Sequence, residues 1–202
     1  MVFGNYPFIS HASSSLKKFA EHLYGYDAIS EKENYQQVNA ITSGLLAVNK
    51  EKMPDKNQFY KDNLSVPAAE EYEIIARFHR QGIPIYMATH IHAIHNHHLE
   101  LQWLVQQQYK YGLGTAEAFL KFPEITGMDK FAALKKNLDG ESGRRTIKKI
   151  LSSGPSRWFL LFYLRITGYI FRNSNRNRII GLLTTAYFWA GYRDGIKRFS
   201  HS

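Results

Sequence analysis

The 202-residue sequence contains no cysteine, so neither a disulfide framework nor a thiolate metal site is available to it. Any metal would need histidine and carboxylate ligands. The first ten residues, MVFGNYPFIS, lack the basic flank and apolar run of a secretory signal, which predicts a cytoplasmic protein. Because 44% of its residues are hydrophobic, the chain is expected to bury a core rather than to be disordered.

Acidic residues are almost missing from the last third of the chain. Residues 142–202 contain 12 lysines and arginines against one acid, Asp194, whereas the preceding residues contain 14 basic and 16 acidic side chains. The net charge of +9 therefore lies entirely in this segment. Such an asymmetry predicts contact with a polyanionic surface, and we expect anionic lipid rather than nucleic acid, because no nucleic-acid motif accompanies the charge.

The apolar runs of this basic segment are short. Residues 158–171 and 179–192 are each 14 residues long, below the roughly 20 that a helix needs to span a bilayer. Their interleaved aromatic residues and arginines predict a helical hairpin lying in a membrane interface. The alternative is a hairpin buried in the protein or at an oligomer contact. The predicted interface residues are Arg157, Trp158, Arg165, Arg172, Trp189 and Arg193.

The segment 65–82 gives the clearest helix signal in the chain. Ser65 is placed to cap it, and Glu73 and Arg77 are spaced to pair one turn apart. Gly82 follows the last residue of the apolar pattern, so the helix is expected to end there.

The other periodic segments complete a predicted α/β fold rich in helices. Strands are expected over 36–48, broken at Gly44, and over 83–94; helices are expected over 13–25, 99–112, 115–122 and 129–138. The helix over 99–112 is predicted to end at Gly112.

Five histidines lie at the junction of the predicted strand over 83–94 with the helix that follows it, two in the end of the strand and three at or after it: His90, His92, His95, His97 and His98. Side chains alternate along a strand, so at most two or three of the five can meet one ion. Two readings stay open, a metal site completed by carboxylates and a set of junction histidines with ordinary hydrogen bonds.

Three glutamates, Glu70, Glu71 and Glu73, crowd the first turns of the 65–82 helix. The positive end of the helix dipole stabilises carboxylates there, which is a sufficient reason for their presence. The alternative is that one of them is a general base facing a cleft.

Several segments, taken in order, resemble the second half of family 2 glycosyltransferases with a GT-A fold. The stretch PAAEEYEIIARFHRQGIPIYMATHIHAIHNHH is similar to the part of that family in which an acidic motif opens a helix and a histidine closes the following strand. LELQWLVQQQYKYGLGTAEAF is similar to the family's next helix, and GYRDGIKR resembles the C-terminal end of membrane-associated members. GNYPF and VNAITSGLLAVNKEKM match earlier segments more loosely.

The resemblance implies a partial GT-A-like sheet with flanking helices over residues 1–140, followed by a basic, aromatic hairpin over 141–202 that meets the inner face of the membrane. It implies that Glu71, with Glu70 beside it, deprotonates the acceptor hydroxyl. It further implies that His95, or else His97, helps to hold a divalent Mn²⁺ or Mg²⁺ ion. The implied acceptor-side residues are Gln107, Tyr109, Tyr111 and Gly112.

The chain has no D-x-D motif, with which this family binds the donor and its metal. We therefore expect a nucleotide sugar and a glycan or lipid acceptor to be used only when another polypeptide supplies the donor-binding half. The chain is expected to assemble with such a partner chain or as a homo-oligomer. Two alternatives remain at this point: a peripheral membrane or interaction protein on a degenerate glycosyltransferase scaffold, and a metal-binding module built on the histidines.

Overall fold

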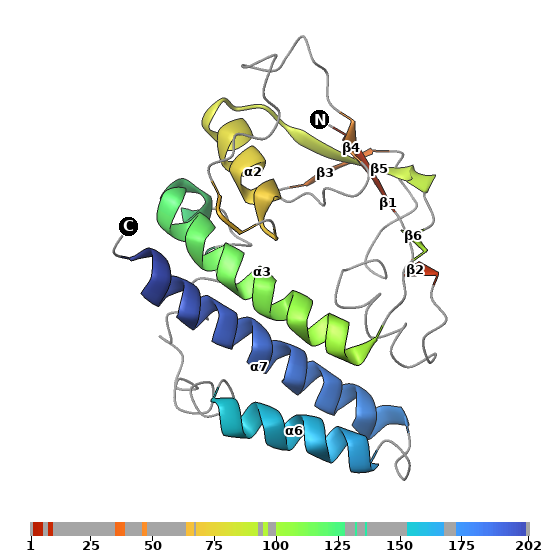
Figure 1. Cartoon of the computed structure of the whole chain (residues 1–202). Coiled ribbons are helices and arrows are strands. Elements are labelled where there is room, and N and C mark those ends of the chain that lie inside the picture. Colours follow the sequence, from red (N-terminus) through yellow and green to blue (C-terminus); the bar gives the residue numbers. More distant parts are fainter. Residues whose placement is uncertain are drawn as a thin grey trace.

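The chain is an α-rich α/β protein in the computed structural model shown in Figure 1. The structure describes residues 2–5, 8–9, 35–38, 46–47, 64–66, 68–92, 95–96, 100–127, 132, 136, 153–167 and 173–200. The segments 13–25 and most of 129–138, both predicted to be helical, lie outside these residues.

The main sheet has four strands in the order β3-β5-β1-β4. Its central strands β1 (Val2–Asn5) and β5 (Ile85–His92) are parallel, and the outer strands β3 (Tyr35–Val38) and β4 (Leu46–Ala47) run antiparallel to their neighbours. The strand expected over 83–94 is confirmed as β5. The strand expected over 36–48 is present as two shorter strands, β3 and β4.

A second, two-stranded parallel sheet pairs β2 (Phe8–Ile9) with β6 (His95–Asn96). Strand β6 follows β5 closely in the chain and precedes the next helix. The histidine-rich segment is therefore located between a strand and a helix, as predicted.

Helix α2 (Glu70–Arg80) confirms the clearest helix prediction, although it begins five residues later than expected. Its N-cap is Ala69, and no side chain caps it, so the assignment of Ser65 as the cap is wrong. Helix α2 ends as expected, because Gly82 adopts the left-handed conformation with φ of 62°.

Helix α3 (Leu101–Lys121) corrects two predictions at once. It does not end at Gly112 but continues for nine more residues, so the helix expected over 115–122 is its last part. A short 3-10 turn, η3 (Pro123–Gly127), follows it. Glycine weakens a helix by only about 1 kcal/mol relative to alanine, and packing on both sides of α3 outweighs that cost.

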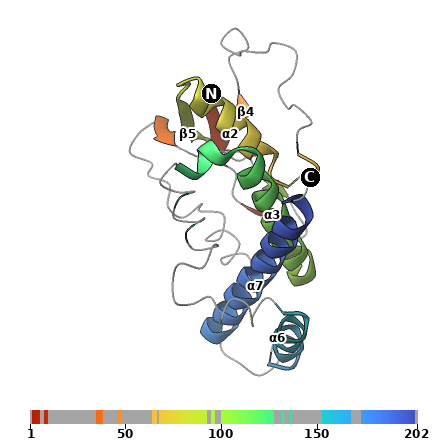
Figure 2. The ribbon, with the colours of Figure 1, turned by 90° about the vertical axis from the view of Figure 1, so that its left-hand side faces the viewer.

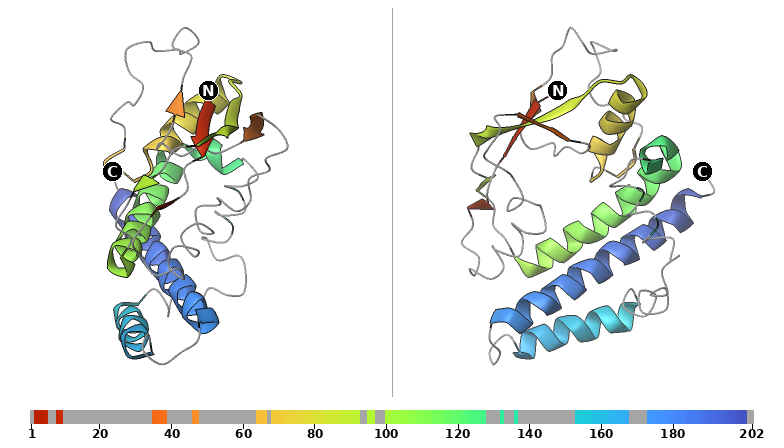
Figure 3. Two further views of the ribbon diagram at one scale, coloured as in Figure 1. Left: turned by 90° about the vertical axis from the view of Figure 1, so that its right-hand side faces the viewer. Right: turned by 180° about the vertical axis from the view of Figure 1, so that it is seen from behind.

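Helices α6 (Gly154–Thr167) and α7 (Asn173–Phe199) form the predicted hairpin. Helix α7 lies along α3 and runs in the same direction, as the colours in Figure 1 and the side view in Figure 2 show. The rear view in Figure 3 places the sheet on one side of α3, with α7 and then α6 on the other. The predicted regions 1–140 and 141–202 therefore contact each other through helices α3 and α7.

The hydrophobic core lies where α2, β5, α3 and α7 meet. Tyr72 of α2 stacks on Phe119 of α3 at a centroid distance of 6.3 Å, and Phe119 meets Tyr192 of α7 edge to face at 6.3 Å. These rings connect three helices across the core. Its other buried members include Ile74, Ile75, Phe78, Ile85, Met87, Ala116, Ala118, Phe122 and Ile125.

Among the helices that the structure describes, none combines the length and the apolar character that crossing a membrane requires.

Candidate functional site

The start of α2 lies directly on α3, and the contact depends on a glycine. Ala69, the N-cap residue, is buried. A Cβ atom added at Gly114 would lie only 2.8 Å from the Cβ of Ala69. Because Gly114 has no side chain, the first turn of α2 can approach α3 this closely. This approach brings the glutamates of that turn toward the side chains of α3.

Glu71 has a strongly altered acidity in this position. Burial raises the pKa of Glu71 from 4.5 to about 7; its own backbone N–H opposes the rise, and the neighbouring Glu70 charge adds to it. A carboxyl group with a pKa near 7 exchanges protons readily at neutral pH, which suits a general base.

Tyr72 connects Glu71 with α3. Burial raises the pKa of Tyr72 to about 12, a hydrogen bond with the Thr115 side chain opposes the rise, and the charges of Glu71 and Tyr111 add to it. Two of the predicted site residues, Glu71 and Tyr111, therefore both lie close enough to Tyr72 for their charges to act on its hydroxyl. We call Glu71, Tyr72, Tyr111 and Thr115 the α2/α3 cluster.

The raised pKa of Glu71 predicts a pH-dependent stability. Folding favours the protonated acid, so the free energy of unfolding should fall as the pH rises from 4.5 through about 7, and then level off. Glu71→Gln should remove this slope, about 2 kcal/mol between pH 5 and pH 8. Urea denaturation at both pH values measures it. Glu100→Gln, at an exposed position, is the matched control, and a slope that survives in Glu71→Gln would contradict the assignment.

Two of the other predicted acceptor-side residues of α3, Tyr109 and Gly112, contact α7 instead of α2. Tyr109 donates a hydrogen bond from its hydroxyl to Asp194 Oδ2 of α7 at 3.1 Å, and burial together with that acceptor raises the pKa of Tyr109. Gly112 lies against the backbone of α7, where an added Cβ would be 1.9 Å from the carbonyl oxygen of Phe188. Gln107 is half-buried on α3. Tyr111, by contrast, interacts with Tyr72 of α2.

The structure does not describe the side chains of the histidines that are predicted to bind a metal. The backbones of His90 and His92 belong to β5 and that of His95 to β6, while His97 is not among the described residues. Within the described part of the chain, no group of three or more histidine, aspartate or glutamate side chains is placed to hold a metal ion.

Glu117 is a buried carboxylate near the start of α2 that the sequence did not single out. Its side chain is fully buried, and it accepts hydrogen bonds from the backbone N–H and hydroxyl of Ser65 at 2.8 and 2.9 Å and from the Val66 N–H at 3.1 Å. Lys121 Nζ lies 2.8 Å from the same carboxylate. Burial alone would raise the pKa of Glu117, but these partners outweigh it and hold the pKa below its usual value.

Glu117 thus fixes the chain that leads into α2, and this explains why Ser65 does not cap that helix. Ser65 donates both its N–H and its hydroxyl to the buried carboxylate in charge-assisted hydrogen bonds, and it lies four residues before the N-cap residue Ala69. The sequence signal was a single acid in an apolar, small-residue stretch, with a lysine four residues later.

The predicted membrane-interface residues divide between two environments. Trp158 is exposed on α6, and the Arg157 guanidinium lies 5.0 Å from the centroid of the Tyr187 ring on α7. By contrast, Trp189 is packed against the hydrophobic core, and the Arg193 Nε lies 3.6 Å from Asp194 Oδ1. Arg165 is part of α6, but its side chain is not among the described ones, and Arg172 is outside the described residues. Of the two tryptophans predicted to meet the membrane, the one on α6 is therefore exposed and the one on α7 faces the core.

Comparison of the chain with protein-family models, with curated proteins and with solved structures finds no match.

Proposed function

We propose that this chain is the acceptor-side part of a family 2-like glycosyltransferase of the GT-A type, with Glu71 as the general base. The observation that carries the proposal is the α2/α3 cluster, in which a partly buried Glu71 lies next to Glu70 and shares Tyr72 with Tyr111. The resemblance of the sequence around Glu71 to the acidic motif of that family adds to this support.

Glu71 would act on the acceptor hydroxyl. Its carboxylate takes the hydroxyl proton while the acceptor oxygen forms a bond to the anomeric carbon of the sugar donor. The bond from that carbon to the donor phosphate oxygen breaks, and the nucleoside diphosphate leaves with the electron pair. A carboxyl group with a pKa of about 7 is deprotonated in half of the molecules at neutral pH, so the base form is available.

The donor side of the reaction is assigned to another polypeptide, because this sequence, and so every copy of this chain, contains no D-x-D motif. The divalent Mn²⁺ or Mg²⁺ ion implied by the resemblance stays a prediction that rests on His95 and His97.

A transfer assay tests the proposal. The purified chain is incubated with Mn²⁺, radiolabelled UDP-, GDP- or dTDP-sugars, and membranes of the source cells, which supply donor-binding partners and acceptors. We expect label transfer that depends on the added chain and falls about a hundredfold in Glu71→Gln, the usual size of a general-base contribution.

Glu100→Gln is the matched control, since Glu100 is an exposed glutamate just before α3. It should keep full activity. Transfer that is equal in Glu71→Gln and in the wild type would exclude Glu71 as the base, and the absence of chain-dependent transfer with every donor would count against the proposed activity.

A second candidate function is a non-enzymatic peripheral membrane protein at the cytoplasmic face of the membrane. It is favoured by the exposed aromatic residues of α6 and by the basic charge of residues 142–202. The two candidates share a membrane location and differ in whether Glu71 matters.

A further inference from the structure

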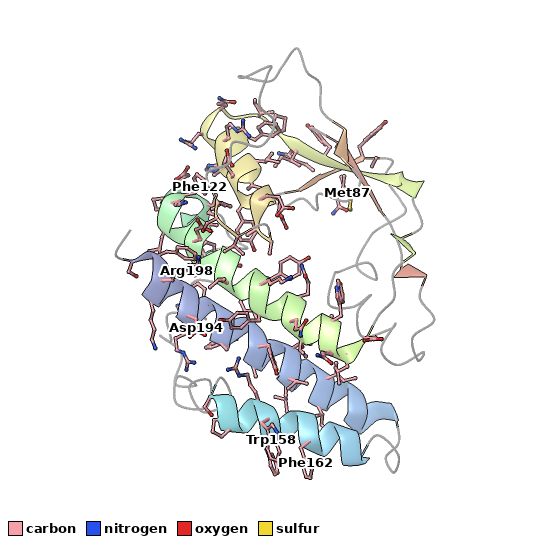
Figure 4. All side chains as sticks on the ribbon, viewed as in Figure 1. Met87, Phe122, Trp158, Phe162, Asp194 and Arg198 are labelled. Atoms are coloured by element: carbon pink, nitrogen blue, oxygen red, sulfur yellow. The ribbon has the colours of Figure 1, made fainter. Side chains whose placement is uncertain are left out.

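Helix α6 carries three exposed aromatic side chains, two of which are the most exposed large hydrophobic side chains that the structure describes. Trp158 and Phe159 expose 65% and 60% of their surface, and Phe162 exposes 46%. The rings of Trp158 and Phe162 stack with centroids 5.2 Å apart and 10° between their planes. Figure 4 shows both rings projecting from the side of α6 that faces away from α7. We call Trp158, Phe159 and Phe162 the α6 aromatic face.

Helical geometry explains why these three side chains share one side. Residues 158 and 162 are one turn apart, and residue 159 is beside them on the helix surface. The other side of α6 packs on α7, where Arg157 lies over the Tyr187 ring. An aromatic face that leaves so much apolar area in water is typical of a docking surface rather than of a solvated helix.

The charge of the hairpin indicates what docks there. Helices α6 and α7 together contain seven lysines and arginines and one acid, Asp194. A second copy of the chain would bring the same positive charge to the contact and would be repelled. An anionic lipid surface offers the opposite charge to the arginines and an apolar boundary layer to the rings.

The dimensions and position of α6 agree with this partner. Its 14 residues extend over about 21 Å, which suits a helix lying in the plane of an interface. Figures 1 and 2 place α6 at the far end of the molecule from the sheet. The molecule can therefore rest on α6 while α2 and the sheet stay clear of the bilayer.

We propose that the α6 aromatic face inserts into the interface of an anionic bilayer, with α7 remaining behind it against α3. The proposal specifies the surface used for the membrane location proposed above and does not depend on Glu71 or on glycosyl transfer.

The test is flotation of the full chain with vesicles of phosphatidylcholine alone or mixed in equal parts with phosphatidylglycerol. We expect binding to the anionic vesicles and a loss of about tenfold or more in Trp158→Gln/Phe162→Gln, since two partly inserted rings are removed. Leu120→Gln is the matched control, because Leu120 is 42% exposed on α3 and lies outside this face. It should bind within about twofold of the wild type.

Quenching by brominated phosphatidylglycerol locates the contact directly. Trp158→Phe keeps an apolar ring and should still bind, but it should lose the tryptophan quenching seen in the wild type. Trp189 packs against the core and Trp103 is half-buried on α3, so neither should be quenched.

Three results would overturn the proposal. One is unchanged vesicle binding by a folded Trp158→Gln/Phe162→Gln variant, with folding checked by circular dichroism. Another is quenching that persists in Trp158→Phe. The third is a wild-type chain that ignores vesicles but forms a dimer that the double substitution dissociates, which would make the face a contact between copies. Each result is independent of the Glu71→Gln transfer assay.

Discussion

Gly191→Ala should lower the melting temperature of this protein by about 6 to 12 °C, although the substitution adds only one methyl group. A Cβ at position 191 would lie 2.0 Å from the carbonyl oxygen of Tyr109 and 3.0 Å from the Leu113 nitrogen. These are backbone atoms of α3, so they cannot rotate away as a flexible side chain would. The two helices must separate or shift, at a cost of about 3 kcal/mol.

The direction of the change in melting temperature distinguishes a close helix contact from the intrinsic preference of helices for alanine. In an open helix, alanine is more stabilising than glycine by about 1 kcal/mol, so a helix without a close neighbour would gain stability. Gly154→Ala provides this comparison, because no atom lies within 4 Å of a Cβ added there. Thermal unfolding followed by circular dichroism should show Gly154→Ala unchanged or raised and Gly191→Ala lowered. Equal melting temperatures for the two variants would contradict the close α3/α7 contact.

Gly112 gives a second view of the same contact. An added Cβ would meet the Phe188 carbonyl oxygen on α7 at 1.9 Å. Gly112→Ala should therefore destabilise in the same direction. Once one alanine has separated the helices the second costs less, so the double variant should lose less stability than the sum of the two single changes.

Glu117→Gln should lower the free energy of unfolding by about 3 kcal/mol, because charge-assisted hydrogen bonds inside the protein are lost. The carboxylate accepts from the Ser65 and Val66 N–H groups and from Lys121, and it is fully buried. In glutamine, an NH2 group replaces one of the two acceptor oxygens. A hydrogen-bond donor would then lie against the donors of Ser65, Val66 or Lys121. Urea denaturation at pH 7 measures the loss.

Glu124→Gln is the matched control for this change. Glu124 pairs with Arg80 at 2.9 Å, but the Arg80 side chain is 57% exposed, and exposed ion pairs contribute only about 0 to 1 kcal/mol. If Glu117→Gln costs no more than Glu124→Gln, the buried carboxylate does not hold the chain ahead of α2.

The stability lost in Glu117→Gln should depend on pH in one direction. Because the pKa of folded Glu117 is below its usual value of 4.5, its contribution is complete above that pH and is lost as the pH falls. The difference between wild type and Glu117→Gln should therefore shrink in acid. Glu71 behaves in the opposite way, since its pKa is raised to about 7, so pH separates the two carboxylates experimentally.

For the candidate site, the sequence singled out two carboxylates at a helix start but not their surroundings. Glu70 and Glu71 were identified from an acidic pair at a helix start, a pattern that is visible over a few residues. That Glu71 would share Tyr72 with Tyr111, while Tyr109 and Gly112 turn to α7, depends on how α3 is rotated between two neighbours. Sequence spacing alone cannot fix that rotation.

The sequence by itself determined those features that depend on neighbours in the chain: α2 and its end at Gly82, the strand β5, the Glu73–Arg77 pair at 3.9 Å, and the α6/α7 hairpin. Side-chain periodicity, helix end signals and pairs one turn apart are all local, so they are readable without the fold.

Only the tertiary structure decided the rest. Helix α3 continues through Gly112 because α7 packs there, and Ser65 bonds to Glu117, 52 residues away, instead of capping α2. Likewise, α7 resembles α6 in composition, yet its Trp189 packs against the core while Trp158 of α6 is exposed. In each case the competing states differ by a few kcal/mol, and the contact that selects one of them comes from a segment distant in sequence.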